Sequence, residues 1–201
     1  MDGWLDPKLQ ETGLAVAIIW IDIVLRQWGG GANAVHSFAR LGANVVTLGF
    51  PEDFDGVKAN IRLAAQALDQ SAKGEALIAR MEQRQTALDL TAANKDPVRV
   101  LYITPGGVTA GARTMIDAMI RAAGMTNAAA DKLYWPALPA EKLLLDPPEL
   151  IAAGFFDSRD EQINYWSAAR HPALRRLMKK TPTVFLEPDI LSCAAWFSLD
   201  G

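Results

Sequence analysis

The stretch Val98–Thr104 (VRVLYIT) constrains the fold more than any other part of the chain. It is a short run rich in β-branched and aromatic residues, which is typical of a strand buried on both faces of a sheet. A Pro-Gly-Gly turn at 105–107 ends it, and Thr114–Ala123 follows with the apolar spacing of an amphipathic helix that stops at Gly124. A strand, a glycine turn and a helix in this order predict an α/β fold with a parallel sheet.

The first third of the chain shows the same order of elements. We expect a strand over Ile18–Leu25, a helix over Ala32–Leu41 and a second strand over Asn44–Phe50. Gly42 ends the helix. These three elements make a βαβ unit, the building block of parallel sheets.

The segment between these two stretches is helical in pattern from Asp53 to Asn94. Its apolar register breaks at 69–74, where Ser71 can cap a second helix over Ser71–Ala92. At 1.5 Å per residue that helix is about 33 Å long, close to the diameter of a small domain. Such a helix suits a strut between two lobes, and an ordinary peripheral helix is the alternative.

The rest of the chain continues the α/β pattern. We expect a short helix, a strand, two helices and a last strand, at Ala140–Leu145, Leu150–Ala153, Glu161–Ala169, Pro172–Lys180 and Thr183–Leu186. The architecture predicted from these patterns is two α/β halves with a helical connector.

Composition excludes several classes of protein. Half of the 201 residues are hydrophobic, which is incompatible with global disorder, and a net charge of −3 gives no basic excess for nucleic acid. The single cysteine, Cys193, excludes an internal disulfide and a cysteine-rich zinc site. The longest apolar run, Leu14–Leu25, is too short to span a bilayer, and the acidic segment before it is unlike a signal peptide.

The glycine loop Gly106–Gly111 (GGVTAG) follows a strand and opens a helix, which is the context of a phosphate cradle. Val108 breaks the dinucleotide-binding pattern, and Ala112 stands where a P-loop needs lysine. The loop therefore predicts a tight turn whose backbone, at Gly106 and Gly107, can approach a ligand beyond the strand ends. A simple strand–helix turn is the alternative.

Catalytic and metal-binding patterns are missing from the sequence. His36 and His171 have no ligand spacing, and Cys193 has no evident histidine partner. We therefore expect no catalytic residue, no metal site and no cofactor. The cations Arg175, Arg176, Lys179 and Lys180 lie at helical spacing and indicate a solvated helix face.

Three tryptophans point to a ligand. Trp28, Trp135 and Trp196 all follow predicted strands or turns, and loops at the carboxyl ends of parallel strands are where α/β folds bind ligands. Each alone is typical of a core or rim position. Together they favour a large, flat, mostly apolar ligand held by aromatic faces.

The segments 98–130 (VRVLYITPGGVTAGARTMIDAMIRAAGMTNAAA) and 133–153 (LYWPALPAEKLLLDPPELIAA) resemble the C-terminal lobe of cluster III substrate-binding proteins. These proteins serve ABC importers of cobalamin and ferric siderophores. The segment 54–88 resembles the end of that family's first lobe and its spanning helix. The resemblance implies two Rossmann-like lobes joined by a single long helix: a partial first lobe at 1–70, the helix at 71–93 and a second lobe at 94–201. The family's opening strands and closing helix have no counterpart here, so we expect the first lobe to be incomplete.

The family's site residues carry over by position. Trp28 and Trp135 match aromatic residues that line the ligand cleft, and Trp196 is a weaker cleft candidate. Glu141, six residues after Trp135, resembles the glutamate that docks onto arginines of the permease. The first lobe offers no matching docking glutamate after its glycine loop, and Glu52 is a possible substitute.

The resemblance implies a periplasmic protein without catalytic activity that captures cobalamin or a ferric siderophore and delivers it to an ABC permease–ATPase complex. We expect a monomer, and heme remains a possible ligand. The alternatives are an α/β enzyme that binds a phosphorylated substrate at Gly106–Gly111, and a relative that binds bare metal ions, which the scattered histidines disfavour.

Overall fold

The computed structural model describes residues 23–26, 31–93, 95–138, 143, 145–155, 172–192 and 195–199. Contacts divide the chain into two units, Met1–Thr47 and Leu48–Gly201. The lobe borders and the spanning role of 71–93 expected from the sequence stay predictions. Within the described residues, no helix is both long and apolar enough to cross a membrane.

The first unit contains the predicted βαβ arrangement. Strand β1 (Ile23–Arg26) pairs in parallel with β2 (Asn44–Thr47), and α2 (Gly31–Arg40) connects them. Gly42 ends the helix with a φ of +83°, a conformation that glycine adopts without a Cβ clash. The part of the predicted first strand before Ile23, and the Trp28 turn, lie outside the described residues.

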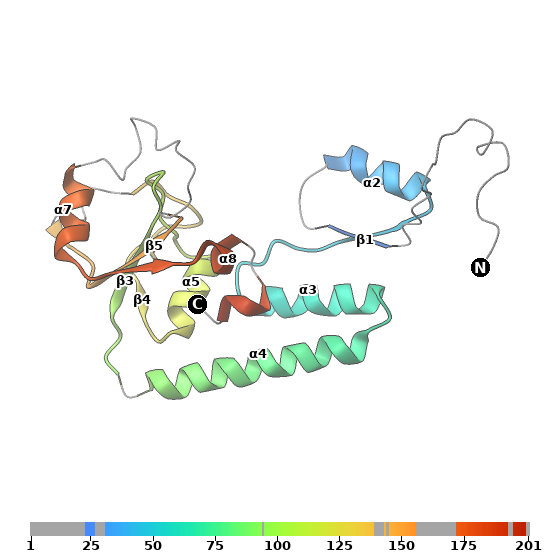
Figure 1. The fold of residues 1–201 in the computed structure, drawn as a ribbon, viewed down its shortest axis with the longest axis horizontal. Coiled ribbons are helices and arrows are strands. Elements are labelled where there is room, and N and C mark those ends of the chain that lie inside the picture. The colour runs from blue at the N-terminus through green and yellow to red at the C-terminus, as the bar shows by residue number, and fades with distance from the viewer. Residues whose placement is uncertain are drawn as a thin grey trace, which may run out of the picture. The chain divides into compact units, whose positions relative to one another are not determined.

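The second unit begins with two long helices, α3 (Phe54–Ala67) and α4 (Ser71–Ala92), which run antiparallel and side by side (Figure 1). Asp53 caps α3 by accepting a hydrogen bond from the Gly56 amide at 2.8 Å. The predicted cap of α4 is wrong, because Gln70 is the N-cap residue, without a side-chain bond, and Ser71 is already helical. The chain turns between α3 and α4 over three residues, of which Asp69 is left-handed (φ 52°).

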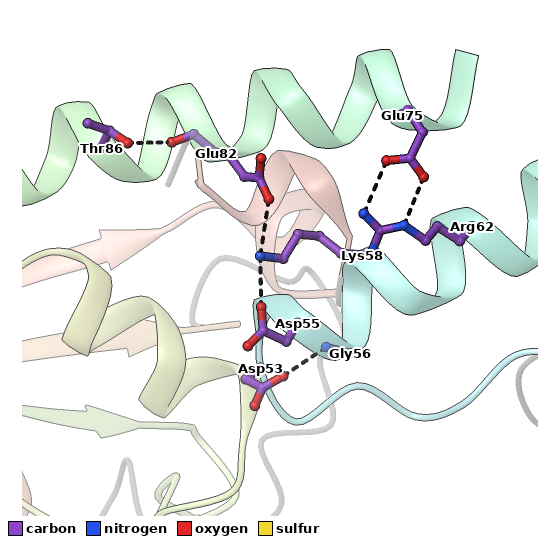
Figure 2. Close-up of polar contacts among 8 residues, drawn as sticks. All are labelled: Asp53, Asp55, Gly56, Lys58, Arg62, Glu75, Glu82 and Thr86. Carbon is purple, nitrogen blue, oxygen red and sulfur yellow. Dashed lines mark hydrogen bonds and ion pairs between the residues drawn. The ribbon is translucent and has the colours of Figure 1, made fainter. Parts of the chain in front are cut away.

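Charged side chains join α3 to α4 along their exposed edge (Figure 2). Arg62 donates two hydrogen bonds to Glu75, at 2.8 and 3.1 Å. Lys58 lies between Asp55, 2.7 Å away, and Glu82, 3.6 Å away. Beneath these pairs an apolar cluster packs the two helices against the rest of the unit; its buried members are Phe54, Val57, Met81, Met115, Ala118 and Leu199.

A four-stranded parallel sheet forms the centre of the second unit, in the order β4 (Thr126–Asn127), β3 (Arg99–Ile103), β5 (Leu150–Gly154) and β6 (Thr183–Leu186). One face carries α7 (Pro172–Lys180) through a cluster that includes Leu101, Ile151, Leu174 and Leu177. The other face carries α5 (Met115–Ala122) through a cluster that includes Val100, Tyr102, Ile116 and Ile120. Covered on both faces, β3 has the continuous apolar pattern of a buried parallel strand.

The sequence predictions for this unit are largely confirmed. The α/β class is confirmed, the bounds of α7 and β6 match the predicted residues, and the cations of α7 are exposed as expected. Three short elements were not predicted: β4, α8 (Pro188–Ser192) and the 3-10 helix η2 (Trp196–Leu199). The helix expected at 161–169 and most of the one expected at 140–145 lie outside the described residues.

Candidate ligand-binding surface

The chain turns sharply where β3 ends. The Thr104 hydroxyl donates a hydrogen bond to the Val108 carbonyl at 3.1 Å, and the Gly107 amide donates to the Thr104 carbonyl at 3.0 Å. Gly107 has a φ of +77°, so the turn requires glycine there. Gly106 is exposed, and a Cβ built on it meets nothing closer than the Thr104 hydroxyl at 3.9 Å. Gly107 is thus explained by the turn, while Gly106 faces open space.

A second segment, 132–138, folds back along the residues that follow this turn. Backbone hydrogen bonds join Thr109 N to Pro136 O (3.0 Å), Gly111 N to Tyr134 O (2.7 Å), Ala112 N to Lys132 O (2.7 Å), Tyr134 N to Ala112 O (2.9 Å) and Leu138 N to Gly107 O (2.9 Å). A Cβ on Gly111 would overlap the carbonyl group of Lys132. The close approach that this glycine allows is therefore an approach to the protein's own backbone.

This pairing weakens the hypothesis of a phosphate cradle in the glycine loop. A cradle needs backbone amides that point outward at the anion. The amides of Gly107, Val108, Thr109 and Gly111 already donate to Thr104, Pro136 and Tyr134 within the protein. Four of the donors that a phosphate would need are thus occupied.

A buried polar cluster anchors the paired segments to the sheet. The Asn127 amide group donates to the Ala110 carbonyl and to the Asp117 carboxylate, both at 2.9 Å, and its oxygen accepts from the Ala129 amide at 3.0 Å. Arg121 donates to the other oxygen of Asp117 at 3.0 Å. Asn127 and Asp117 are 9% and 5% exposed, so this buried cluster ties the loop at Ala110 to the residues that follow β4 at Ala129.

Three consecutive apolar side chains are exposed on the second segment. Leu133, Tyr134 and Trp135, here called the aromatic patch, are 58%, 44% and 48% exposed. The Trp135 ring meets the ring of buried Tyr102 edge-on, with centroids 6.3 Å apart. Burial raises the pKa of Tyr102 to about 12, so this supporting ring is neutral at physiological pH. The patch offers aromatic faces to solvent on a rigid base.

A cation lies beside the patch. The Arg113 guanidinium lies 5.3 Å from the centre of the Tyr134 ring, within the range of a cation–π contact. It also donates two hydrogen bonds to the Glu52 carboxylate, at 2.7 and 3.1 Å, and this bonding raises the pKa of Arg113. Arg113 and a role for Tyr134 were not predicted from the sequence, because neither residue belongs to a recognisable motif.

The other predicted site residues are not all placed. Trp28 and Glu141 lie outside the described residues. Trp196 is 45% exposed on η2 and its ring meets Phe197, with centroids 5.8 Å apart. No ring contact joins Trp196 to Trp135 in the described part of the chain.

Two of the hollows in the described part of the second unit are lined in part by strands of the sheet. One, of about 300 Å³, lies beside the second segment and is lined by residues that include Leu101, Thr109, Ala129 and Pro136. The other, of about 230 Å³, is almost wholly apolar and includes Val100, Met119, Leu186 and Leu199. Neither contains a residue of the aromatic patch in its lining, so the patch is an open surface rather than a wall of either hollow.

Metal ligands do not gather in the described residues. His36 is exposed on α2, and His171 lies outside them. No group of three His, Cys, Asp or Glu side chains in the part of the chain that the structure describes could hold a metal ion.

The chain is similar to known proteins in sequence and in fold. The family model described as "Periplasmic binding protein" matches residues 36–164. The structure of the periplasmic heme-binding protein BhuT in complex with two hemes is 26% identical in sequence, with a TM-score of 0.65 over 87% of this chain and 69% of that one. No curated protein sequence matches the chain.

Two further solved structures share the fold at lower identity. The periplasmic heme-binding protein HutB of Vibrio cholerae has a TM-score of 0.75 at 18% identity, over 89% of this chain and 73% of that one. An ABC-type Fe3+-hydroxamate transport system from Saccharomonospora viridis has a TM-score of 0.65 at 19% identity, over 90% and 66%. These likenesses support the predicted fold class.

Proposed function

Because this chain belongs to the periplasmic binding protein family, we propose that it is the substrate-binding component of an ABC importer and that its ligand is a large iron complex, heme or a ferric siderophore. The family consists of solute-binding proteins, which are non-enzymatic parts of transport systems. BhuT, at 26% identity, is described as heme-binding, and this favours heme as the first ligand to test.

The aromatic patch is the observation that carries the proposal. Exposed apolar side chains that are clustered commonly mark a binding surface, and here Tyr134 and Trp135 are neighbours on a segment held by backbone hydrogen bonds. Large planar faces bind a planar apolar ligand with little loss of side-chain entropy. The patch lies beyond the carboxyl end of β3, where α/β folds bind their ligands.

Cobalamin, the other ligand expected from the sequence, stays a prediction. The relatives described above name heme and Fe3+-hydroxamate. Cobalamin shares with heme a broad apolar ring, so the same aromatic patch suits it in shape. Only a direct comparison of the ligands distinguishes them.

Delivery to the importer completes the proposal. The partner is an ABC permease–ATPase complex, and the protein works as a monomer in the periplasm. Docking through Glu141 rests on the sequence resemblance alone. Because a rim carboxylate governs association rates more than folding, a Glu141→Ala variant should load ligand normally and be captured more slowly by the transporter at low salt.

Titration of the purified protein with hemin tests the ligand, followed by Soret absorbance and by quenching of tryptophan fluorescence. A ferric hydroxamate siderophore and cyanocobalamin serve as the competing ligands. The Trp135→Ala variant should bind hemin roughly 5- to 150-fold more weakly, which corresponds to about 1–3 kcal/mol for the loss of a large aromatic contact.

Leu90→Ala is the matched control, because Leu90 is 71% exposed on α4 and belongs to no proposed site. Its hemin affinity should equal that of the wild type. Equal affinity of the Trp135→Ala variant would remove the patch from the binding site. Saturable binding of phosphate or nucleotide, with none of hemin, siderophore or corrinoid, would instead support the enzyme alternative.

A further inference from the structure

Arg113 and Tyr134 share an unusual backbone conformation. Their φ angles are +62° and +59°, in the left-handed region that residues with a Cβ rarely adopt. Both lie next to the bridge between Ala112 and Leu133, and hydrogen bonds on either side hold them there. Such strain persists only where the surroundings enforce it, and it is concentrated at ligand-binding positions. Here it places the two side chains against each other at the edge of the aromatic patch.

The ion pair that Arg113 makes does not explain this strain. The side chains of Arg113 and Glu52 remain 57% and 34% exposed, and ion pairs in contact with water contribute little to stability. The guanidinium fork binds Glu52 through two parallel hydrogen bonds, a geometry that suits any carboxylate. An incoming carboxylate can therefore replace Glu52 on the same two donors.

The released Glu52 would also be accommodated. It directly precedes Asp53, the N-cap of α3, and α3 is a helix of 14 residues. The positive end of the helix dipole favours a negative charge at that position. If a ligand carboxylate takes the place of Glu52 on Arg113, the freed Glu52 carboxylate still lies at the favourable N-terminal end of α3.

We propose that Arg113 selects ligands that carry a carboxylate, by exchanging Glu52 for the ligand's carboxylate while Tyr134 and Trp135 hold the ligand's apolar body. This inference rests on the proposed function. Heme carries two propionate carboxylates on its rim, whereas a hydroxamate group carries none. Arg113 would therefore favour heme, or a carboxylate-bearing siderophore, over ligands of similar size that lack the carboxylate.

Hemin and hemin dimethyl ester test the inference, because the ester keeps the ring and the iron but lacks the carboxylates. The wild type should bind hemin about tenfold more tightly than the ester, the scale of one good charge-assisted contact. Arg113→Gln should lose this difference by weakening hemin alone. Glu52→Gln should strengthen hemin binding severalfold, since it removes the competing carboxylate, and should leave the ester unchanged.

Arg62→Gln is the control, because Arg62 is about as exposed as Arg113 and makes a similar two-bond pair with Glu75 on the α3–α4 edge (Figure 2). It should change neither affinity. If the wild type and Arg113→Gln both bind hemin and the ester equally well, the inference is overturned and the proposed function stands. If the wild type binds only a ferric siderophore that lacks a carboxylate, the inference is overturned and the proposed function stands. If it binds neither hemin compound nor any ferric siderophore, both fail.

If the Arg113→Gln variant does not fold, the inference is still tested by Glu52→Gln. Glu52→Gln is an independent variant, and its melting temperature shows whether it is folded. Hemin affinity in that variant no higher than in the wild type would overturn the exchange of partners. A severalfold gain confined to hemin would support it.

Discussion

Replacement of Gly111 by alanine tests whether the ligand-binding surface depends on one backbone contact. Gly111 is buried, and its φ is not left-handed, so its backbone conformation alone would accept alanine. The added Cβ would overlap the carbonyl group of Lys132, whose carbonyl carbon would lie 2.8 Å away. Both atoms of that group are backbone, so no side-chain rotation relieves the overlap and the two segments must separate.

The expected size of the effect follows from the bonds that separation breaks. Three hydrogen bonds join 111–112 to 132–134, at 2.7, 2.7 and 2.9 Å. At about 1 kcal/mol each, their loss lowers the free energy of unfolding by about 3 kcal/mol. Alanine also restricts the unfolded chain, which offsets about 0.4–1 kcal/mol. The net loss is about 2 kcal/mol, or about 4–8 °C in melting temperature for a chain of this size.

Gly106→Ala is the matched comparison, since its Cβ would meet nothing closer than 3.9 Å and its φ is also not left-handed. That variant should be as stable as the wild type, or slightly more stable. Thermal unfolding followed by circular dichroism at 222 nm measures both variants. Melting temperatures that agree within about 1 °C would refute the reasoning, because the close contact at Gly111 would then have no energetic consequence.

Two further variants test the interior beneath this surface. Burial raises the pKa of Tyr102 to about 12 in the folded protein, against about 10 in the unfolded chain. The contribution of the neutral phenol to folding stability is therefore fully present below about pH 10 and is lost as the pH rises toward about 12. Across that pH window the free energy of unfolding in urea should fall by up to about 2–3 kcal/mol more for the wild type than for Tyr102→Phe. The same pH dependence in both proteins would contradict this. Asn127→Ala should lower the free energy of unfolding in urea by about 3 kcal/mol or more, because one oxygen of Asp117, the Ala110 carbonyl and the Ala129 amide each lose a buried partner. A cost under 1 kcal/mol would show that water replaces the amide group.

Local patterns in the sequence were sufficient to predict most helices and strands of the second unit. The apolar run that forms β3 is buried on both faces, and the periodicity of 172–180 places Leu174 and Leu177 in the core and the cations in solvent. Such elements are predictable because neighbouring residues in the sequence determine which side of the element is buried. The cap of α4 was not predicted correctly, since the residue at the N-cap, Gln70, makes no side-chain cap bond and so does not follow residue preference.

The candidate site was predictable only in part. Trp135 was identified from the sequence, and the structure leaves it half-exposed beyond β3, but its role in binding stays a prediction, as do those of Trp28, Trp196 and Glu141. Gly106 and Gly107 were predicted to approach a ligand. The turn itself accounts for Gly107, and the close approach in this loop belongs to Gly111.

The sequence by itself determined the α/β class, the strand-turn-helix order around the glycine loop and the family to which the chain belongs. These depend on residues close together in the chain. Only the tertiary structure decided that Arg113 pairs with Glu52, 61 positions away. It also decided that position 111 has no space for a side chain, because the Lys132 backbone passes beside it. The physical reason is that both contacts arise where distant segments return to the same end of a sheet. No local pattern encodes that return, because it depends on the packing of every element between the two residues.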